Sequence, residues 1–373
     1  MKSCTILHTE SSPGWGGQEI RILTESAGMI ERGHKVIIAC QPDAVIAKRA
    51  EEQGIETITM RIGGATDFAA IRQLSAIMRN RGVDIVNTHS SKDSWSAGIA
   101  AKFAGRTKVI RTRHLSIPVK KGLVSKYPFL NLPDAVVTTG EALRERLIEE
   151  VGIPPMDIVS IPTGIDLSRF DPEKADGSRF RAEIGIPGDA PLVGSVGMLR
   201  VMKGHKYLID AVAQAAKTIS DIRLVIVGDT AFASDIKEQL AAQTADLGMK
   251  DRIIMLGYRE DIPDILAELD LFVLASIRSE GVPQVINQAM AMKKPVVATD
   301  VGSVREQAIN GETGFLVEPA DSDQIAKAII TLIGDPERAS RMGENGRKLV
   351  EEKFNLESML DATESLYERL LGS

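Results

Sequence analysis

The sequence contains little of what marks a secreted or membrane-spanning protein. It has only two cysteines in 373 residues. Cys4 and Cys40 each lie in a short apolar run, so we expect two buried free thiols rather than a disulfide or a metal site. No apolar run approaches the ~20 residues that cross a bilayer. The first apolar run is broken by His8 and Glu10, which is unlike a signal peptide. These features predict a cytoplasmic protein.

Bulk composition excludes a disordered chain. Apolar residues make up 43% of the sequence and charged residues 26%, a balance typical of globular proteins. A chain of 373 residues is too long for one ordinary domain and suits two. We therefore expect two folded cores.

Acidic residues are missing from one part of the first half. Residues 1–170 carry 22 Lys and Arg against 18 Asp and Glu, whereas the remainder carries 23 against 33. No acid lies between Asp93 and Asp134, a stretch with eight bases: Lys102, Arg106, Lys108, Arg111, Arg113, Lys120, Lys121 and Lys126. This pattern indicates either an anionic partner, such as a phosphorylated acceptor or the inner face of the cytoplasmic membrane, or a solvated face balanced by acids from elsewhere.

Short β-branched runs alternate with longer amphipathic stretches along the whole chain. The first half contains CTILHT, KVIIAC, TITMRI, DIVNTHS, KVIRTRH, AVVTTG and IVSIPTG, and the second PLVGSVG, IRLVIVG, RIIMLG, DLFVLAS, PVVAT and GFLVE. Strands that are nearly all apolar and separated by helices indicate parallel sheets covered on both faces. The fold class is therefore α/β, with two doubly wound, Rossmann-like domains.

A polar stretch, EKADGSRFRAEIGIPGDAP, separates the two sets of strands. Its proline, glycine and charge content suits a linker with one short helix. We expect a first domain at 1–170, a linker at 171–190 and a second domain at 191–352. Ligands of doubly wound sheets bind beyond the carboxyl ends of the strands, so we expect a cleft where the two domains face each other.

Two cations follow the first strand of the second domain. Arg200 and Lys203 lie in a loop that leads into a helix, with Gly204 at the turn. Cations beside a helix N-terminus form an anion site, because free backbone N–H groups and the helix dipole add to their charge. The alternative is a pair of solvent-exposed bases at a domain edge.

A carboxylate follows a later strand, DLFVLAS, of the same domain. Glu280 and Gly281 precede a stretch, Val282 to Met292, that is expected to be helical, and Gln288 lies eight residues beyond Glu280. Two helical turns would place Glu280 and Gln288 near one line on the ligand side. A glycine allows backbone amides to approach a phosphate, and a carboxylate binds sugar hydroxyls. Alternatively, Glu280 only favours the start of a helix.

These residues resemble a motif of the large group 1 family (family 4) of retaining glycosyltransferases with the GT-B fold. Its pattern, close to S-x-x-E-G-x-P-x-x-x-x-E-A-M-A-x-x-x-P-V, is matched at Ser276, Glu280, Gly281, Pro283, Ala289, Met290, Ala291, Pro295 and Val296. Further landmarks, DAVVTTGEALRERL, IPTGIDLSRF, VGMLRVMKGH, VGSVREQAINGETGFLV and GRKLVEEKF, follow in the family's order. The resemblance covers nearly the whole chain and implies that a C-terminal helix, 353–373, packs back on the first domain.

The resemblance implies roles for individual residues. Glu280 corresponds to a glutamate that contacts the donor sugar, and Lys203 to a lysine that holds the diphosphate. Two positions depart from the family: Gln288 replaces a glutamate that binds the ribose, and Met198 replaces an arginine, for which Arg200 is the substitute. The implied donor-binding residues are Gly16, Gly17, Gly281, Val282, Pro283, Gln288, Val304 and Glu306.

The first domain contributes a glycine pair and two histidines. Gly16 and Gly17 follow the first strand and are implied to approach the donor phosphates. His89 and His114 each end a strand, at the edge expected to face the cleft. His114 aligns with a family histidine near the donor sugar and acceptor, so we assign it, with Glu280, Lys203 and Arg200, to catalysis.

The resulting prediction is a hexosyltransferase-type, metal-independent enzyme without a cofactor. Its partners would be a nucleoside diphosphate sugar and a glycan or lipid-linked acceptor of cell-envelope type, and no nucleic acid. The D-x-D run at Asp321 to Asp323 opens a helix and is expected to cap it rather than bind a metal. Two alternatives stay open: a GT-B enzyme that is not a transferase, such as a nucleotide-sugar epimerase, and a binding module without catalysis. A dinucleotide oxidoreductase is disfavoured because GWGGQE lacks the G-x-G-x-x-G spacing.

Overall fold

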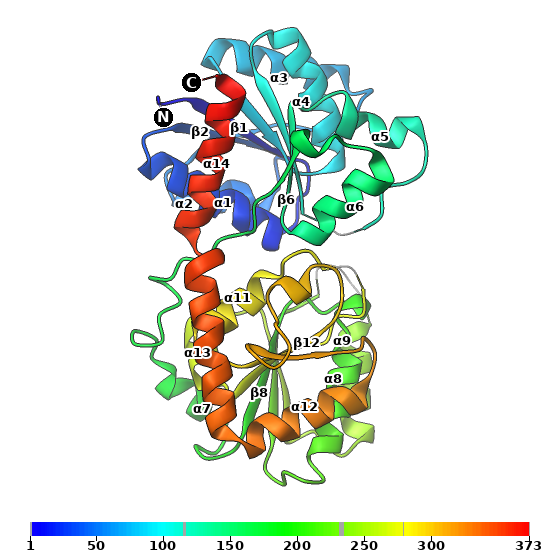
Figure 1. The fold of residues 1–373 in the computed structure, drawn as a ribbon, viewed down its shortest axis with the longest axis vertical. Helices are drawn as coiled ribbons and strands as arrows, with labels where there is room; N and C mark the ends of the chain where they lie inside the picture. Colours follow the sequence, from blue (N-terminus) through cyan, green and yellow to red (C-terminus); the bar gives the residue numbers. More distant parts are fainter. Residues whose placement is uncertain (1, 115–116, 231–234, 279, 373) are drawn as a thin grey trace. The chain divides into compact units, whose positions relative to one another are not determined.

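The computed structural model describes residues 2–114, 117–230, 235–278 and 280–372. The chain divides into two compact units, one formed by Met1–Thr163 and Glu357–Ser373 and the other by Gly164–Leu356. Each unit is an α/β fold built around one parallel sheet (Figure 1). The predicted α/β class is confirmed, and all thirteen predicted strand runs contain a strand.

The first unit contains a seven-stranded sheet in the order β3-β2-β1-β4-β5-β6-β7. The strands are β1 Thr5–Glu10, β2 Lys35–Cys40, β3 Glu56–Thr59, β4 Ile85–Thr88, β5 Lys108–Arg113, β6 Ala135–Thr138 and β7 Ile158–Ser160. Its helices are α1 Gly17–Glu31, α2 Val45–Glu52, α3 Phe68–Arg81, α4 Ser91–Ala104, α5 Leu123–Leu130 and α6 Glu141–Val151. All strand pairs are parallel, and the central strands are almost wholly buried because helices cover both faces. Cys4 and Cys40 are buried free thiols, as predicted.

The second unit contains a six-stranded parallel sheet in the order β10-β9-β8-β11-β12-β13. The strands are β8 Leu192–Val196, β9 Arg223–Val227, β10 Ile253–Gly257, β11 Leu271–Leu274, β12 Val296–Thr299 and β13 Gly314–Val317. Its helices are α7 Phe180–Glu183, α8 His205–Ala215, α9 Ile236–Asp246, α10 Ile262–Glu268, α11 Gln284–Ala291, α12 Ser322–Gly334 and α13 Pro336–Lys353. Apolar side chains form one core on each face of this sheet.

The boundary between the units differs from the expected one. The second unit begins at Gly164, and the stretch expected as a linker, 171–190, belongs to it. Phe180 and Ile186 of this stretch are buried in the core of the second unit. Composition indicated a linker because this stretch is rich in charge, glycine and proline, but its few apolar side chains are enough to anchor it to the core.

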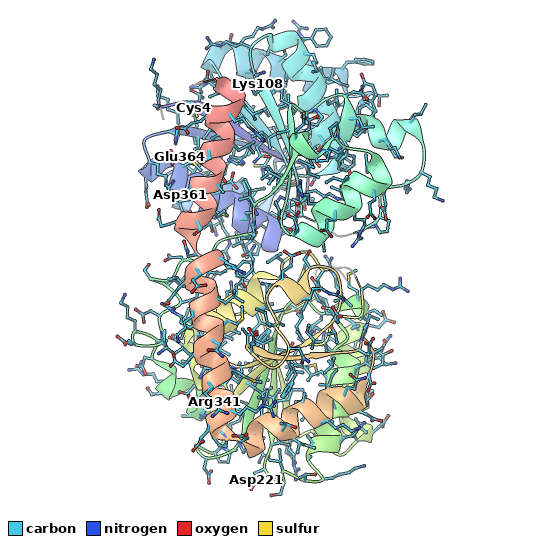
Figure 2. The ribbon with its side chains drawn as sticks, in the orientation of Figure 1. Cys4, Lys108, Asp221, Arg341, Asp361 and Glu364 are labelled. Atoms are coloured by element: carbon cyan, nitrogen blue, oxygen red, sulfur yellow. The ribbon has the colours of Figure 1, made fainter. Side chains whose placement is uncertain are left out.

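The C-terminal helix α14, Leu356–Leu371, belongs mainly to the first unit. In Figure 1 it lies beside the start of the chain. Arg32, at the end of α1, forms ion pairs with Glu357, Asp361 and Glu364 of α14, two of which are labelled in Figure 2. A buried face that includes Leu360 packs closely on α1. This helix therefore completes the fold of the first unit.

Each sheet has one point where the strand order reverses, between β1 and β4 in the first and between β8 and β11 in the second. At such a point the loops that follow the two neighbouring strands diverge and leave space for a ligand. The segments that follow these four strands carry Gly16 and Gly17, His89, Lys203, and Glu280. The topology therefore places most of the predicted site at the two reversal points.

Candidate active site

Lys203 and Glu280 meet at the reversal point of the second sheet. Lys203 ends a 3₁₀ turn, Val201–Lys203, after β8, and Glu280 follows β11. The Lys203 ammonium lies 2.6 Å from Oε1 of Glu280, and the Ser276 hydroxyl donates to the same oxygen at 2.5 Å. Both charged side chains are mostly buried, with 22% and 13% exposed. The structure thus brings together the two residues expected to hold the diphosphate and the sugar.

Two glycines fix the backbone around this pair. Gly204 has a φ of +66°, and a Cβ on it would lie 1.9 Å from the carbonyl oxygen of Ala275. Gly302 has a φ of +59°, and a Cβ on it would lie 1.9 Å from the carbonyl oxygen of Glu280. Only glycine tolerates both the left-handed conformation and the close approach. Gly204 and Gly302 therefore hold the loops of Lys203 and Glu280 against neighbouring backbone.

Helix α11 is shorter than predicted. It begins at Gln284, with Pro283 as its N-cap residue, rather than at Val282. Glu280 therefore lies outside the helix, and the expected alignment of Glu280 with Gln288 through two helical turns is wrong. The physical reason is Pro283, which has no N–H and a fixed φ, so the helix begins at the residue that follows it. Gln288 lies on α11 and is partly exposed.

Several predicted donor-binding residues are buried on this side of the sheet. The side chains of Val282 and Val304 have 6% and 0% exposed area and belong to the core. Gln307 donates to the Pro283 carbonyl at 3.0 Å and thereby ties α11 to the loop after β12. Val282 and Val304 therefore offer a ligand only backbone groups, whereas Glu306 keeps a partly exposed side chain.

The expected substitute for the missing arginine is accessible. Arg200 is exposed and precedes the 3₁₀ turn that ends at Lys203. The backbone N–H of Lys203 donates to the Arg200 carbonyl at 2.9 Å, so the two cations share one short turn. Helix α8 begins directly after Gly204, which adds free backbone N–H groups beside these charges. This arrangement can bind an anion.

In the first unit, one hydrogen-bond network joins the loop after β1 to the loop after β4. Glu10, the last residue of β1, accepts hydrogen bonds from Gln18 and from Ser90. Gln18 lies in the first turn of α1, directly after Gly16 and Gly17, and also donates to Ser90 at 3.0 Å. Glu10 is fully buried. The glycine turn is therefore anchored to the loop that carries His89.

His114 follows β5 and contacts His89. Nε2 of His114 lies 2.9 Å from Nδ1 of His89. His114 is partly exposed, whereas His89 is 5% exposed, so His114 is the histidine of this pair that a ligand can reach. Burial and the positive charge of Arg21 hold the pKa of His114 well below its usual value, which keeps the imidazole neutral. This placement favours His114 over His89 for ligand contact.

Sequence reasoning missed His8. His8 lies inside β1, is fully buried, and places Nδ1 2.9 Å from Nε2 of His89. The available signal was that His8, His89 and His114 lie in or next to β1, β4 and β5. These three strands are neighbours in the sheet, but strand order is not readable from a single sequence.

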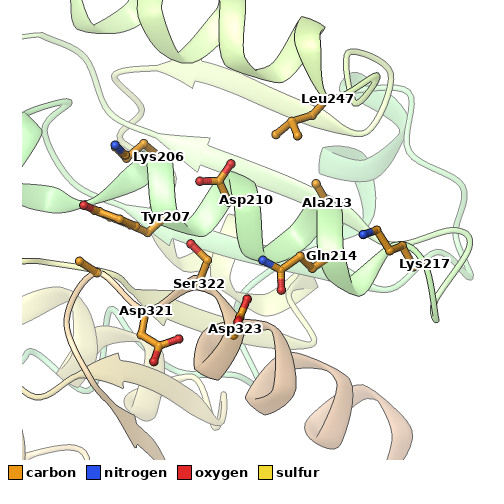
Figure 3. A pocket seen from close by; sticks show the side chains of 11 residues that line it. Lys206, Tyr207, Asp210, Ala213, Gln214, Lys217, Leu247, Asp321, Ser322 and Asp323 are labelled. Atoms are coloured by element: carbon orange, nitrogen blue, oxygen red, sulfur yellow. The ribbon is translucent and has the colours of Figure 1, made fainter.

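A surface groove of about 680 Å³ lies between α8 and the start of α12 (Figure 3). Its lining includes Tyr207, Asp210 and Asp323 but none of the predicted site residues. Asp321, at its rim, accepts a hydrogen bond from the backbone N–H of Gln324 at 2.9 Å. The predicted capping role of the D-x-D run is thereby confirmed.

Among residues 2–114, 117–230, 235–278 and 280–372, no group of three or more His, Cys, Asp or Glu side chains is placed to hold a metal ion. In the same ranges, no helix combines the length and the apolar character needed to cross a bilayer.

Both halves of the chain match known protein families. Residues 15–169 match the model of glycosyltransferase family 4, and residues 176–349 match that of the glycosyl transferases group 1. A UDP-Gal:alpha-D-GlcNAc-diphosphoundecaprenol alpha-1,3-galactosyltransferase from Escherichia coli is 30% identical over 84% of this chain and 82% of its own. The chain belongs to the group 1 glycosyltransferases.

Solved structures show the same fold. A glycosyltransferase from Rickettsia africae superposes with a TM-score of 0.92 at 25% identity, covering 100% of this chain and 99% of its own. HepE from Anabaena, crystallised with UDP-glucose, superposes with a TM-score of 0.86 at 23% identity over 97% of this chain and 99% of its own. The predicted GT-B fold with two Rossmann-like domains is confirmed.

Proposed function

We propose that this glycosyltransferase moves a sugar from a nucleoside diphosphate sugar to a glycan or lipid-linked acceptor of the cell envelope, with retention of configuration. The observation that carries the proposal is the Lys203–Glu280 pair at the reversal point of the second sheet. Support for the donor comes from the UDP-glucose complex of HepE. Support for the acceptor comes from the Escherichia coli relative, whose name specifies a diphosphoundecaprenol-linked sugar.

In the proposed chemistry, positive charge of the protein lies where the leaving group develops negative charge. Breaking the anomeric bond leaves a nucleoside diphosphate with growing negative charge. Lys203, Arg200 and the N-terminus of α8 would stabilise that charge as preorganised cations and dipoles. Glu280 would accept hydrogen bonds from the donor sugar once Lys203 turns to the diphosphate.

Fixed cations supply the stabilisation that a divalent ion gives in other transferases, so we expect no metal requirement. Gln288 would bind the ribose hydroxyls as a neutral amide, with one donor group and one acceptor group. We expect weaker nucleotide binding than a carboxylate would give, because the charge-assisted part of the interaction is lost.

The exposed surface of α5 supports a membrane-associated acceptor. In the structure, several of the eight bases of the basic stretch make contacts within the protein. Lys108 pairs with Asp134, Arg111 is buried against Phe129, and Lys126 donates to the Val151 carbonyl. Lys120 and Lys121 remain exposed next to α5. On α5, 89% of Leu123 and 76% of Val124 are exposed. Exposed apolar side chains beside lysines suit the boundary of an anionic bilayer.

Two experiments test the proposal. Incubation with nucleoside diphosphate sugars, with and without lipid-linked acceptor, should release nucleoside diphosphate and form an acceptor glycoside of retained configuration. Isomerisation of the donor without acceptor would instead indicate an epimerase, and binding without any product would indicate a module without catalysis.

For the membrane, sedimentation with anionic vesicles should exceed that with neutral vesicles. Leu123→Asp combined with Val124→Asp should abolish this sedimentation, whereas Phe68→Asp, a control at a 78% exposed phenylalanine, should not. Equal binding to both kinds of vesicle would refute the membrane contact.

A further inference from the structure

Three histidines of the first unit form a continuous chain. Nδ1 of His8 lies 2.9 Å from Nε2 of His89, and Nδ1 of His89 lies 2.9 Å from Nε2 of His114. The ring centroids are 5.2 Å apart at both steps. The side chains come from three neighbouring strands or the residues just after them, β1, β4 and β5. The chain runs from the buried core at His8 to a partly exposed end at His114.

This geometry couples the three protonation patterns. A neutral imidazole carries one N–H donor and one acceptor nitrogen. His89 uses both nitrogens, one toward each neighbour, so only two arrangements satisfy both hydrogen bonds. Either all three rings carry the proton on Nδ1, or all three carry it on Nε2. Burial lowers the pKa values of His8 and His89 as well as His114, so the neutral forms are the relevant ones.

The buried end selects between the two arrangements. Nε2 of His8 is buried and has no hydrogen-bond partner among the described residues. The Nε2 arrangement would leave an N–H there without an acceptor, and buried N–H groups without partners are rarer in native proteins than under-used acceptors. The charged groups that act on His8 are Glu25 and Arg21. Glu25 raises the pKa of His8 and Arg21 lowers it, and the two form an ion pair with each other at 3.4 Å. The hydrogen-bond count therefore favours the Nδ1 arrangement.

We propose that His8 and His89 are positioning residues that hold His114 in its Nδ1–H form and so present a hydrogen-bond donor to the substrate. The atom that accepts this hydrogen bond would be an oxygen of the nucleoside diphosphate sugar or of the glycan acceptor. This identification of the substrate rests on the proposed function. Nε2 of His114 is occupied by His89, and among the described residues Nδ1 of His114 has no hydrogen-bond partner. In this form His114 donates a proton in a hydrogen bond and does not act as a general base.

Nitrogen NMR of the full-length protein tests the proposal without an activity assay. The sequence contains five histidines, so selective ¹⁵N-histidine labelling gives few imidazole signals. His114→Gln identifies the signals of His114. We expect a protonated Nδ1 and an unprotonated Nε2 for His114 at pH 7. A protonated Nε2 at His114 would overturn the proposal.

Substitution of the buried end tests the coupling. His8→Asn keeps an amide N–H near the position of Nδ1 and should preserve the tautomer of His114, whereas His8→Leu removes the donor and should mix or reverse it. The matched control is His34→Asn, because His34 is a buried histidine that is not one of the three hydrogen-bonded histidines. This variant should leave the His114 signals unchanged. Unchanged signals in folded His8→Leu would refute the coupling.

Kinetics add a second readout once transfer is established. His8→Leu should lower kcat/KM about tenfold, the effect of losing one neutral hydrogen bond in the transition state. His8→Asn should recover most of the kcat/KM that His8→Leu loses, although the two variants have equal melting temperatures. Absence of transfer in the wild-type enzyme would refute the proposed function and leave the tautomer measurement standing. Equal kcat/KM in both His8 variants would contradict the positioning role.

Discussion

Replacement of Lys203 by alanine probes the centre of the proposed site. In the free enzyme the variant leaves the mostly buried Glu280 carboxylate with Ser276 as its remaining side-chain partner among the described residues. Loss of the ion pair should destabilise the second unit by about 1–3 kcal/mol, the cost of a buried group left under-satisfied. During transfer the variant also loses the cation proposed to stabilise the leaving diphosphate. Removal of one such preorganised group costs about 3–4 kcal/mol, which corresponds to roughly 10²–10³ in kcat.

Initial rates of nucleoside diphosphate release measure this effect, and calorimetry with the free nucleoside diphosphate measures binding. Lys237→Ala, at an exposed lysine of the same unit, is the matched control and should behave as the wild type. The double variant with Glu280→Ala should lose less activity than the two single losses combined, because the residues are in contact. A Lys203→Ala enzyme with kcat/KM within about threefold of the wild type, less than ~1 kcal/mol of transition-state stabilisation, would refute the assignment.

Three further predictions concern backbone fit, pH and metal. Gly302→Ala should displace the Glu280 backbone, and its loss of transition-state stabilisation should be at least as large, as a free energy, as its loss of folding stability. Gly188→Ala, where a Cβ meets open space, should change neither quantity. Transfer rates and melting temperatures of both variants check this. Burial, aided by the charge of Lys203, lowers the pKa of His205 to about 4 from 6.5. Its stabilising contribution is therefore present above pH 6.5 and lost as the pH falls toward 4. Amide protection factors of α8, which correct for the slower intrinsic exchange at low pH, should fall between pH 6.5 and about 4 in the wild type and less so in His205→Leu. Transfer should persist in excess chelator, and its loss with recovery on adding Mg²⁺ or Mn²⁺ would refute metal independence.

The strands and the central pair were predictable because both depend on local sequence. Nearly apolar runs bounded by glycine identify parallel strands, and the carboxyl ends of such strands meet at one edge of a sheet. Lys203 and Glu280 each follow such a run, and the structure brings them to 2.6 Å. The start of α11 was misjudged because the apolar pattern extends through Pro283, although that proline limits the helix.

Features that depend on long-range packing were not predictable. His8 looks like a polar interruption in an apolar strand until β4 and β5 are known to lie beside β1. The basic stretch looks uniformly exposed, yet Arg111 is 4% exposed. Burial of a charged side chain depends on partners from other elements, which sequence spacing does not specify.

The path of the chain has a consequence for how the protein is made. The second unit lies between two segments of the first, and its ends are joined: Ile165 donates to the Phe354 carbonyl at 2.8 Å, and Leu356 donates to the Ile165 carbonyl at 3.0 Å. During synthesis the ribosome therefore completes the later-starting unit first. The earlier-starting unit waits for α14, whose Tyr367 is fully buried. Until then the face of α1 that receives α14 is uncovered, and exposed apolar surface of this kind makes a nascent intermediate prone to aggregation.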